Sequence, residues 1–122
     1  MHPPRPYVNI YLMHDGKRYA KWKSSVHYDT AVQVFNETFQ FNVSKMDVAL
    51  VELCIHVKEY HRTHLNNLLG VVGIGLTAKG AGKIHWREVI NSPRHQISHW
   101  HSVVPLEGTH LHPPATTPII RT

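Results

Sequence analysis

The stretch that decides the fold runs from Gly16 to Phe41 and reads GKRYAKWKSSVHYDTAVQVFNETFQF. Its first half alternates between apolar and polar residues, and a period of two is the pattern of a half-buried strand. Trp22 and Val26 are expected to point into a core. The opposite face of this strand is predicted to carry three cations in a row, Lys17, Lys21 and Lys23. Such a row fits an anion-binding surface, but an ordinary solvated face has the same spacing.

Strands are also predicted on both sides of this basic segment. Upstream, Tyr7–Met13 alternates in the same way. The following His14-Asp15-Gly16-Lys17 sequence predicts a hairpin turn, because Asp-Gly favours the positive φ angles that tight turns need. Downstream, three phenylalanines alternate with polar residues and predict a strand over 34–43. Further strands are expected over 49–58, 68–76 and 97–104, and a short helix over 83–91.

These elements together predict an all-β antiparallel sandwich with one short helix before the last strand. Residues 1–6 are expected to be an extended N-terminal segment and 7–104 the folded domain. Residues 105–122 contain four prolines and no periodic pattern, so a flexible tail is predicted there.

The bulk composition fits a single basic domain. The chain has 122 residues, with 13 Lys and Arg against 8 Asp and Glu, which gives a net charge of +5. Four of the cations lie between Lys17 and Lys23, so an anionic partner is favoured. Cys54 is the single cysteine, which excludes an intrachain disulfide and indicates a reducing compartment.

Several classes of function find little support. No apolar run is long enough to span a bilayer, and the N-terminus is unlike a signal peptide, so a cytoplasmic protein with peripheral membrane contact is expected, any anchor lying outside this chain. No nucleophile and base can be paired, so catalysis is not expected. Nucleic-acid binding is not expected either, because an inward Trp22 leaves no stacking platform. The twelve histidines raise the question of zinc binding, but no HxxxH pair on a predicted helix and no cysteine partner is present. Their protonation below about pH 6 would add positive charge and strengthen anion binding.

From Pro6 to Val104 the chain resembles a synaptotagmin C2 domain, and specifically the second, membrane-distal one. Five segments carry the resemblance: PYVNIYLMHDGKR, KWKSSV, VFNETFQF, LLGVVGIG and HWREVINSPRHQISHWHSV. The last includes the Trp-His pair typical of that domain, here Trp100 and His101. The family fold has two strands before the segment that starts at Pro6, so the resemblance implies an N-terminally incomplete C2 sandwich.

The resemblance also implies a calcium-independent member. Family members bind calcium through aspartates in two loops at one end of the sandwich. The matching positions here are Arg5, Glu59, His61 and Asn67. Calcium needs six to eight oxygen ligands, and of these four residues only Glu59 is anionic. Calcium is therefore not expected as a cofactor, and no other metal is expected.

The family's polybasic strand implies the binding partners. In this chain it carries Lys17, Arg18, Lys21 and Lys23. The family uses this face for anionic phospholipids, phosphoinositides and acidic proteins such as membrane-fusion machinery and clathrin adaptors. The expected function is thus a trafficking module that docks electrostatically. The alternative is a protein-interaction module, in which the same face or the Trp100-His101 end binds a partner or a second copy of the chain, with negligible lipid affinity.

Overall fold

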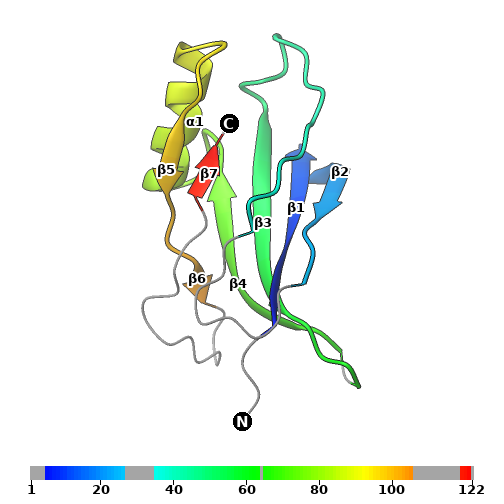
Figure 1. Cartoon of the computed structure of the whole chain (residues 1–122). Coiled ribbons are helices and arrows are strands. Elements are labelled where there is room, and N and C mark those ends of the chain that lie inside the picture. Colours follow the sequence, from blue (N-terminus) through cyan, green and yellow to red (C-terminus); the bar gives the residue numbers. More distant parts are fainter. Residues whose placement is uncertain (1–4, 27–34, 64, 106–118, 122) are drawn as a thin grey trace.

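The computed structural model describes residues 5–26, 35–63, 65–105 and 119–121. They form an antiparallel β structure with one short helix, which confirms the predicted all-β class (Figure 1). The main sheet has the strand order β2-β1-β3-β4-β6, and β5 pairs with β7 in a second, small sheet. The elements are β1 (Pro6–His14), β2 (Lys17–Lys23), β3 (Val51–Glu59), β4 (Asn67–Ile74), α1 (Ala81–Asn91), β5 (Ser98–Trp100), β6 (Val104–Pro105) and β7 (Ile119–Arg121).

The predicted hairpin joins β1 to β2. Asp15 and Gly16 have φ angles of 51° and 73°, and two consecutive positive φ values are what a tight hairpin turn of the primed type requires. The register then shifts between Leu12 and Met13 through a β-bulge. Beyond this bulge, Met13 pairs with Arg18 and no longer continues the pattern that places Tyr11 opposite Lys21. A bulge moves side chains between faces, and this one decides which cations lie together.

β1 lies between β2 and β3 in the sheet and is buried on both faces. On one face, Val8, Ile10 and Leu12 join the hydrophobic core. On the other face, Tyr7 and Tyr11 are 2% and 4% exposed. Long side chains from the neighbouring strands cover this face.

α1 closes the core beside β4, at the end of the sheet far from β2 (Figure 1). The Trp86 side chain enters the core, and its indole Nε1–H donates a 2.8 Å hydrogen bond to the carbonyl O of Val48. A Cβ at position 82 would collide with the carbonyl O of Gly73, so Gly82 permits the close approach of helix and strand.

The phenylalanine-rich segment departs from the predicted strand. Residues 35–43 carry no strand assignment, and none of the described strands pairs with them. Asn36 has a φ of 49°, and this left-handed conformation interrupts an extended ladder. The side chains nevertheless pack as the alternation predicts: Phe35, Phe39 and Phe41 are partly buried against the core, and Phe39 stacks on Trp22 with 5.0 Å between ring centroids.

The C-terminal part also differs from its prediction. In place of one strand over 97–104, β5 and β6 are separate strands that belong to different sheets. β7 pairs with β5, with Ile119 opposite Trp100, so the tail predicted for 105–122 includes a strand. Residues 1–4 of the predicted N-terminal segment and 106–118 of that tail lie outside the described residues.

Candidate anion-binding face

Four cations gather over two buried tyrosines on the outer side of β1. The guanidinium carbon of Arg18 lies 4.1 Å from the ring centroid of Tyr11, and Lys21 Nζ lies 5.8 Å from the same ring. Lys23 Nζ is 4.8 Å and Lys58 Nζ is 5.9 Å from the ring centroid of Tyr7. We call this surface, made by Arg18, Lys21, Lys23 and Lys58 above Tyr7 and Tyr11, the basic face.

The composition of the basic face corrects the sequence-based prediction at one position. Lys17 is paired with His14, which places it on the same side of the sheet as Leu12, away from Lys21 and Lys23. Arg18 takes its place because of the β-bulge. The fourth cation is Lys58 of β3, which pairs with Tyr7 across the sheet. The alternation of β3 already assigns Lys58 to the outer side, but only strand pairing brings it next to β2.

The tyrosine rings hold these cations in a fixed arrangement. A cation over an aromatic face is stabilised by about 0.5–1 kcal/mol at an exposed site, and the aliphatic stems cover the ring while the charged ends remain in water. Arg18, Lys21 and Lys23 are exposed and Lys58 is half-buried. The salt bridges found among the described residues involve His14 and His99, and none of these four cations. Their charge is thus available to an external anion.

The positions that match the calcium loops lie together at one end of β1, β3 and β4. Glu59 is paired with Pro6 on one side and with Asn67 on the other. The backbone N–H of Tyr60 donates to the carbonyl O of Arg5 at 2.9 Å, and Asn67 Nδ2 donates to His61 Nε2 at 2.9 Å. The four predicted positions are therefore brought to one end, with a single carboxylate among them.

A second asparagine orders this loop. The backbone N–H of His61 donates to Asn66 Oδ1 at 2.9 Å, and Asn66 Nδ2 donates to the hydroxyl of Tyr7 at 2.8 Å. The loop is thus tied to the tyrosine that lies beneath Lys23 and Lys58. Sequence reasoning missed Asn66, because the contact joins residues 59 positions apart.

Comparison with known proteins now places the chain. The family model of the C2 domain matches residues 1–89. The chain belongs to the C2 domain family. It is 37% identical over 99 residues to Synaptotagmin-6 of Mus musculus, and the matched region covers 81% of this chain and 19% of that protein. It is 39% identical over 103 residues to Synaptotagmin-10 of Rattus norvegicus, covering 84% and 20%, and 39% identical over 99 residues to Synaptotagmin-9 of Homo sapiens, covering 81% and 20%. The chain spans about a fifth of the length of these curated relatives.

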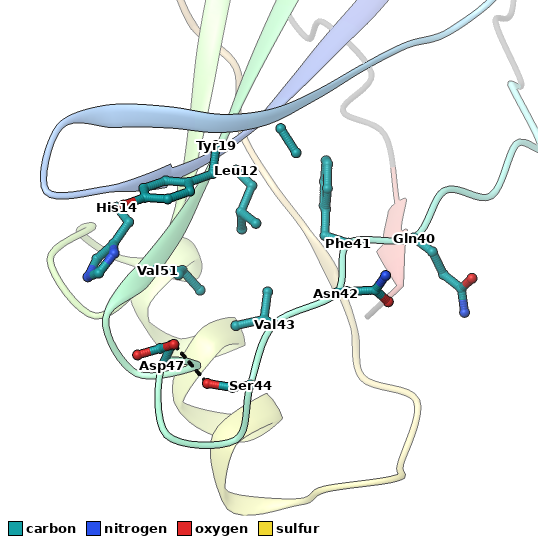
Figure 2. A pocket seen from close by; sticks show the side chains of 11 residues that line it. Leu12, His14, Tyr19, Gln40, Phe41, Asn42, Val43, Ser44, Asp47 and Val51 are labelled. Atoms are coloured by element: carbon teal, nitrogen blue, oxygen red, sulfur yellow. Dashed lines mark hydrogen bonds between the residues drawn. The ribbon is translucent and has the colours of Figure 1, made fainter.

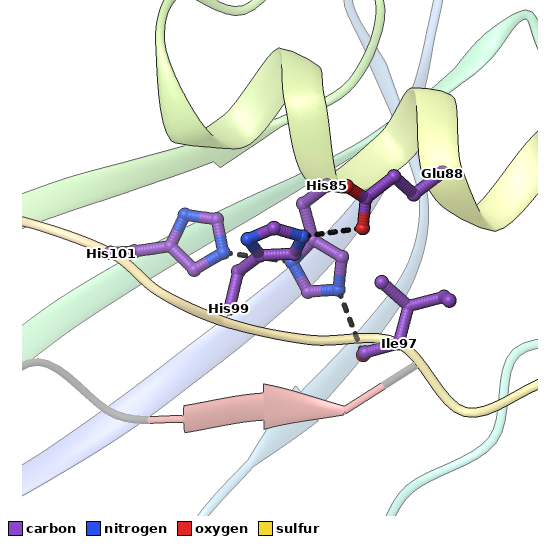
Figure 3. Close-up of polar contacts among 5 residues, drawn as sticks. All are labelled: His85, Glu88, Ile97, His99 and His101. Atoms are coloured by element: carbon purple, nitrogen blue, oxygen red, sulfur yellow. Dashed lines mark hydrogen bonds and ion pairs between the residues drawn. The ribbon is translucent and has the colours of Figure 1, made fainter.

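This C2 domain also contains a cluster of three histidines between α1 and the C-terminal strand segment (Figure 3). His85 Nε2–H donates to the carbonyl O of Ile97 at 3.1 Å, so the other ring nitrogen, Nδ1, accepts from His101 Nε2–H at 2.8 Å. His99 Nε2 lies 2.7 Å from Glu88 Oε2. We call His85, His99 and His101, with Glu88, the histidine cluster.

Burial keeps the inner rings of the histidine cluster neutral. His85 is fully buried and His101 is 3% exposed. Burial, followed by the charges of His85 and His99, lowers the pKa of His101 to about 4, and burial also lowers the pKa of His85. No group of three or more His, Cys, Asp or Glu side chains with metal-binding geometry occurs within the described ranges.

The Trp-His pair of the C2 domain is divided between surface and core. Trp100 is 64% exposed, whereas His101 is buried in the histidine cluster. The predicted partner-binding pair therefore narrows to Trp100, since a buried ring cannot contact a partner directly.

Cys54, on the outer side of β3, has a pKa raised by burial, which does not favour a reactive thiolate.

A groove of about 410 Å³ lies on the opposite side of β1 from the basic face (Figure 2). It is bounded by the β1–β2 hairpin and by residues 40–47, and Leu12, Phe41 and Val43 are among its lining. Its carboxylate, Asp47, accepts a 2.8 Å hydrogen bond from Ser44 Oγ.

Among the residues the structure describes, no helix has the length and hydropathy of a membrane span.

Proposed function

We propose that this C2 domain is a calcium-independent docking module that binds anionic phospholipid through the basic face and acts in vesicle trafficking. The observation that carries the proposal is the set of four cations held over Tyr7 and Tyr11 without carboxylate partners among the described residues. The similarity to synaptotagmins supports the same conclusion. In this proposal the protein is cytoplasmic and attaches peripherally to the membrane surface.

The strength of such docking follows from the number of cations. Each cation near an anionic surface contributes about 1 kcal/mol, so four contribute about 4 kcal/mol, or roughly a thousandfold enrichment. Attachment of this kind weakens as salt screens the charges. Stable residence at a membrane therefore needs a second signal, which in this proposal is a protein partner or another part of a longer polypeptide.

The loop end supports the calcium-independent part of the proposal. Glu59 is the one carboxylate at the four matching positions, and the Asn67 amide is engaged with His61 through its nitrogen. Arg5 adds a positive charge at the same end. A site with so few anionic oxygens is unsuited to a cation that takes six to eight oxygen ligands. We further infer that the chain corresponds to the second C2 domain of its relatives, on the basis of α1 and the Trp100-His101 pair.

The test is flotation with phosphatidylcholine vesicles that contain or lack phosphatidylserine, in calcium and in chelator. Wild-type protein is expected to bind only the anionic vesicles and to ignore calcium. Lys21→Ala/Lys23→Ala should lose about 2 kcal/mol of binding, which is roughly thirtyfold. Lys79→Ala/Lys83→Ala removes the same charge from exposed positions at and before α1 and should retain most binding.

Three results would contradict the proposal in different ways. Binding that requires calcium would overturn our interpretation of the loop end. Equal loss in the two double variants would show that net charge, and not the basic face, governs docking. A folded protein that binds no vesicle would favour the alternative, a protein-interaction module, for which the exposed Trp100 is the supporting observation.

A further inference from the structure

His56 lies within the basic face, on the outer side of β3. In the sheet register it is opposite Asn9 of β1 and opposite Val71 of β4. Its ring contacts the edge of Tyr11, with 4.9 Å between centroids, and Tyr11 is the ring that Arg18 covers. The imidazole and the Arg18 guanidinium, one of the cations that the proposed function assigns to lipid binding, therefore contact the same tyrosine ring.

The charges that shift the pKa of His56 are positive, although Glu52 lies on the same side of the sheet. Burial, followed by the charges of Arg18 and Lys58, lowers its pKa. β2 contributes cations, β1 contributes the aromatic ring of Tyr11, and β4 has no titratable residue over Asn67–Ile74. The titratable or charged groups on these elements that share this side with His56 are Tyr7, Tyr11, Arg18, Lys21, Lys23, Glu52, Cys54 and Lys58.

Asn9 provides a second observation at the same place. It is 3% exposed, and its side-chain Oδ1 is buried without a hydrogen-bond partner among the described residues. A buried acceptor without a donor costs free energy. Neutral imidazole has one N–H, and protonated imidazole has two. Protonation of His56 therefore adds a donor directly across the sheet from an acceptor that lacks one.

We propose that His56 is a proton-coupled residue of the basic face, which becomes protonated when the face binds anionic phospholipid, so that docking strengthens as the pH falls. The inference rests on the proposed function. Without a ligand, burial disfavours the protonated ring, and Arg18 and Lys58 also repel the proton. A bound phosphate offsets this repulsion and attracts the protonated ring, so the anion favours the proton. By reciprocity, the proton favours the anion by the same factor.

The test measures binding to phosphatidylcholine vesicles containing phosphatidylglycerol at about pH 7.5 and about pH 5.5, a range that spans the titration of histidine. Phosphatidylglycerol is chosen because its phosphodiester does not titrate in this range, so only the protein changes charge. Wild-type binding is expected to tighten by roughly threefold to tenfold, since one unit of pKa shift corresponds to a tenfold change in affinity.

Three variants separate His56 from other causes. His56→Gln cannot take up the proton and should lose most of the tightening, measured as the ratio of its affinities at the two pH values. His56→Lys carries a permanent charge and should bind tightly at both pH values. His95→Gln changes an exposed histidine in the loop after α1 and should keep the wild-type pH dependence. Far-ultraviolet circular dichroism at each pH verifies that the variants are folded.

The outcomes distinguish this inference from the function on which it rests. Wild-type binding to anionic vesicles with unchanged pH dependence in His56→Gln would overturn the inference and leave the basic face in place. Absence of wild-type binding at both pH values would overturn both. A direct readout is the His56 pKa from nuclear magnetic resonance, which should rise when short-chain phosphatidylglycerol is added, and an unchanged pKa would contradict the proposal.

Discussion

The basic face and the histidine cluster both combine aromatic rings with titratable groups, but they place charge differently. In the basic face, Tyr7 and Tyr11 are buried and the cations above them reach solvent. In the histidine cluster, His85 and His101 are themselves buried and neutral. The cations of the first region remain available to an outside anion, whereas the ring nitrogens of His85 are both used inside the protein.

The difference follows from where the hydrogen-bonding demand is met. A buried ring that finds its partners internally joins two elements and resists change, because loss of one member leaves the other unsatisfied. Exposed cations on long stems cost little to rearrange and gain little stability from one another. The two regions should accordingly respond to mutation in opposite ways, one through stability and the other through binding.

The largest expected effect is on stability, from His85→Ala. The substitution removes a fully buried ring together with its hydrogen bonds to the Ile97 carbonyl and to the His101 N–H. We expect a loss of about 3–4 kcal/mol in the free energy of unfolding, measured by urea denaturation. His95→Ala, at an exposed position, is the control and should change stability by less than about 0.5 kcal/mol. A loss below about 1 kcal/mol for His85→Ala would show that the cluster does not hold α1 in place.

A somewhat smaller effect is expected from acid. The pKa of His101 is about 4 in the folded protein against 6.5 for a free histidine. Unfolding therefore takes up a proton between these two values, so the contribution of His101 is fully present above about pH 6.5 and falls as the pH falls toward 4. The loss is at most on the order of 3 kcal/mol.

This acid effect is measured by thermal or urea unfolding over the same pH range. His101→Gln, which cannot titrate, isolates the contribution of this one ring from that of the carboxylates. Its stability should depend less on pH than that of the wild type. Parallel curves for the two proteins would contradict the assignment of His101 as a buried neutral group.

The smallest expected effect is on vesicle binding, and it is tested by comparing a lysine of the basic face with a lysine on the other side of the sheet. Lys58→Ala should weaken binding to phosphatidylserine vesicles by about 1 kcal/mol, or roughly fivefold. Lys17→Ala removes the same charge from the other side of the sheet and should cost less than half as much. Neither change should affect stability by more than about 0.5 kcal/mol. A larger effect of Lys17 would show that the β-bulge does not define the binding surface.

The basic face shows how far local pattern reaches. The alternation of 17–23 correctly predicts exposed cations at Lys21 and Lys23 and an inward Trp22. It assigns Lys17 to the wrong side, because the β-bulge shifts the register between Ala20 and Arg18, inside the segment over which the alternation was counted.

The phenylalanine-rich segment shows a second limit of the same kind. Its apolar positions pack against the core as predicted. A strand, however, also needs a hydrogen-bonding neighbour, and none of the described residues supplies one. Side-chain burial follows from the sequence of the segment itself, whereas ladder formation depends on another part of the chain.

The sequence by itself determined the all-β class, the hairpin at Asp15-Gly16, the helix before the C-terminal strands and the resemblance to C2 domains, because alternation, turn residues and motifs are local properties. Only the tertiary structure decided that Lys58 joins the basic face, that His56 lies among its cations and that His85 meets His101. These contacts depend on strand register and on packing between distant segments, which no local pattern encodes.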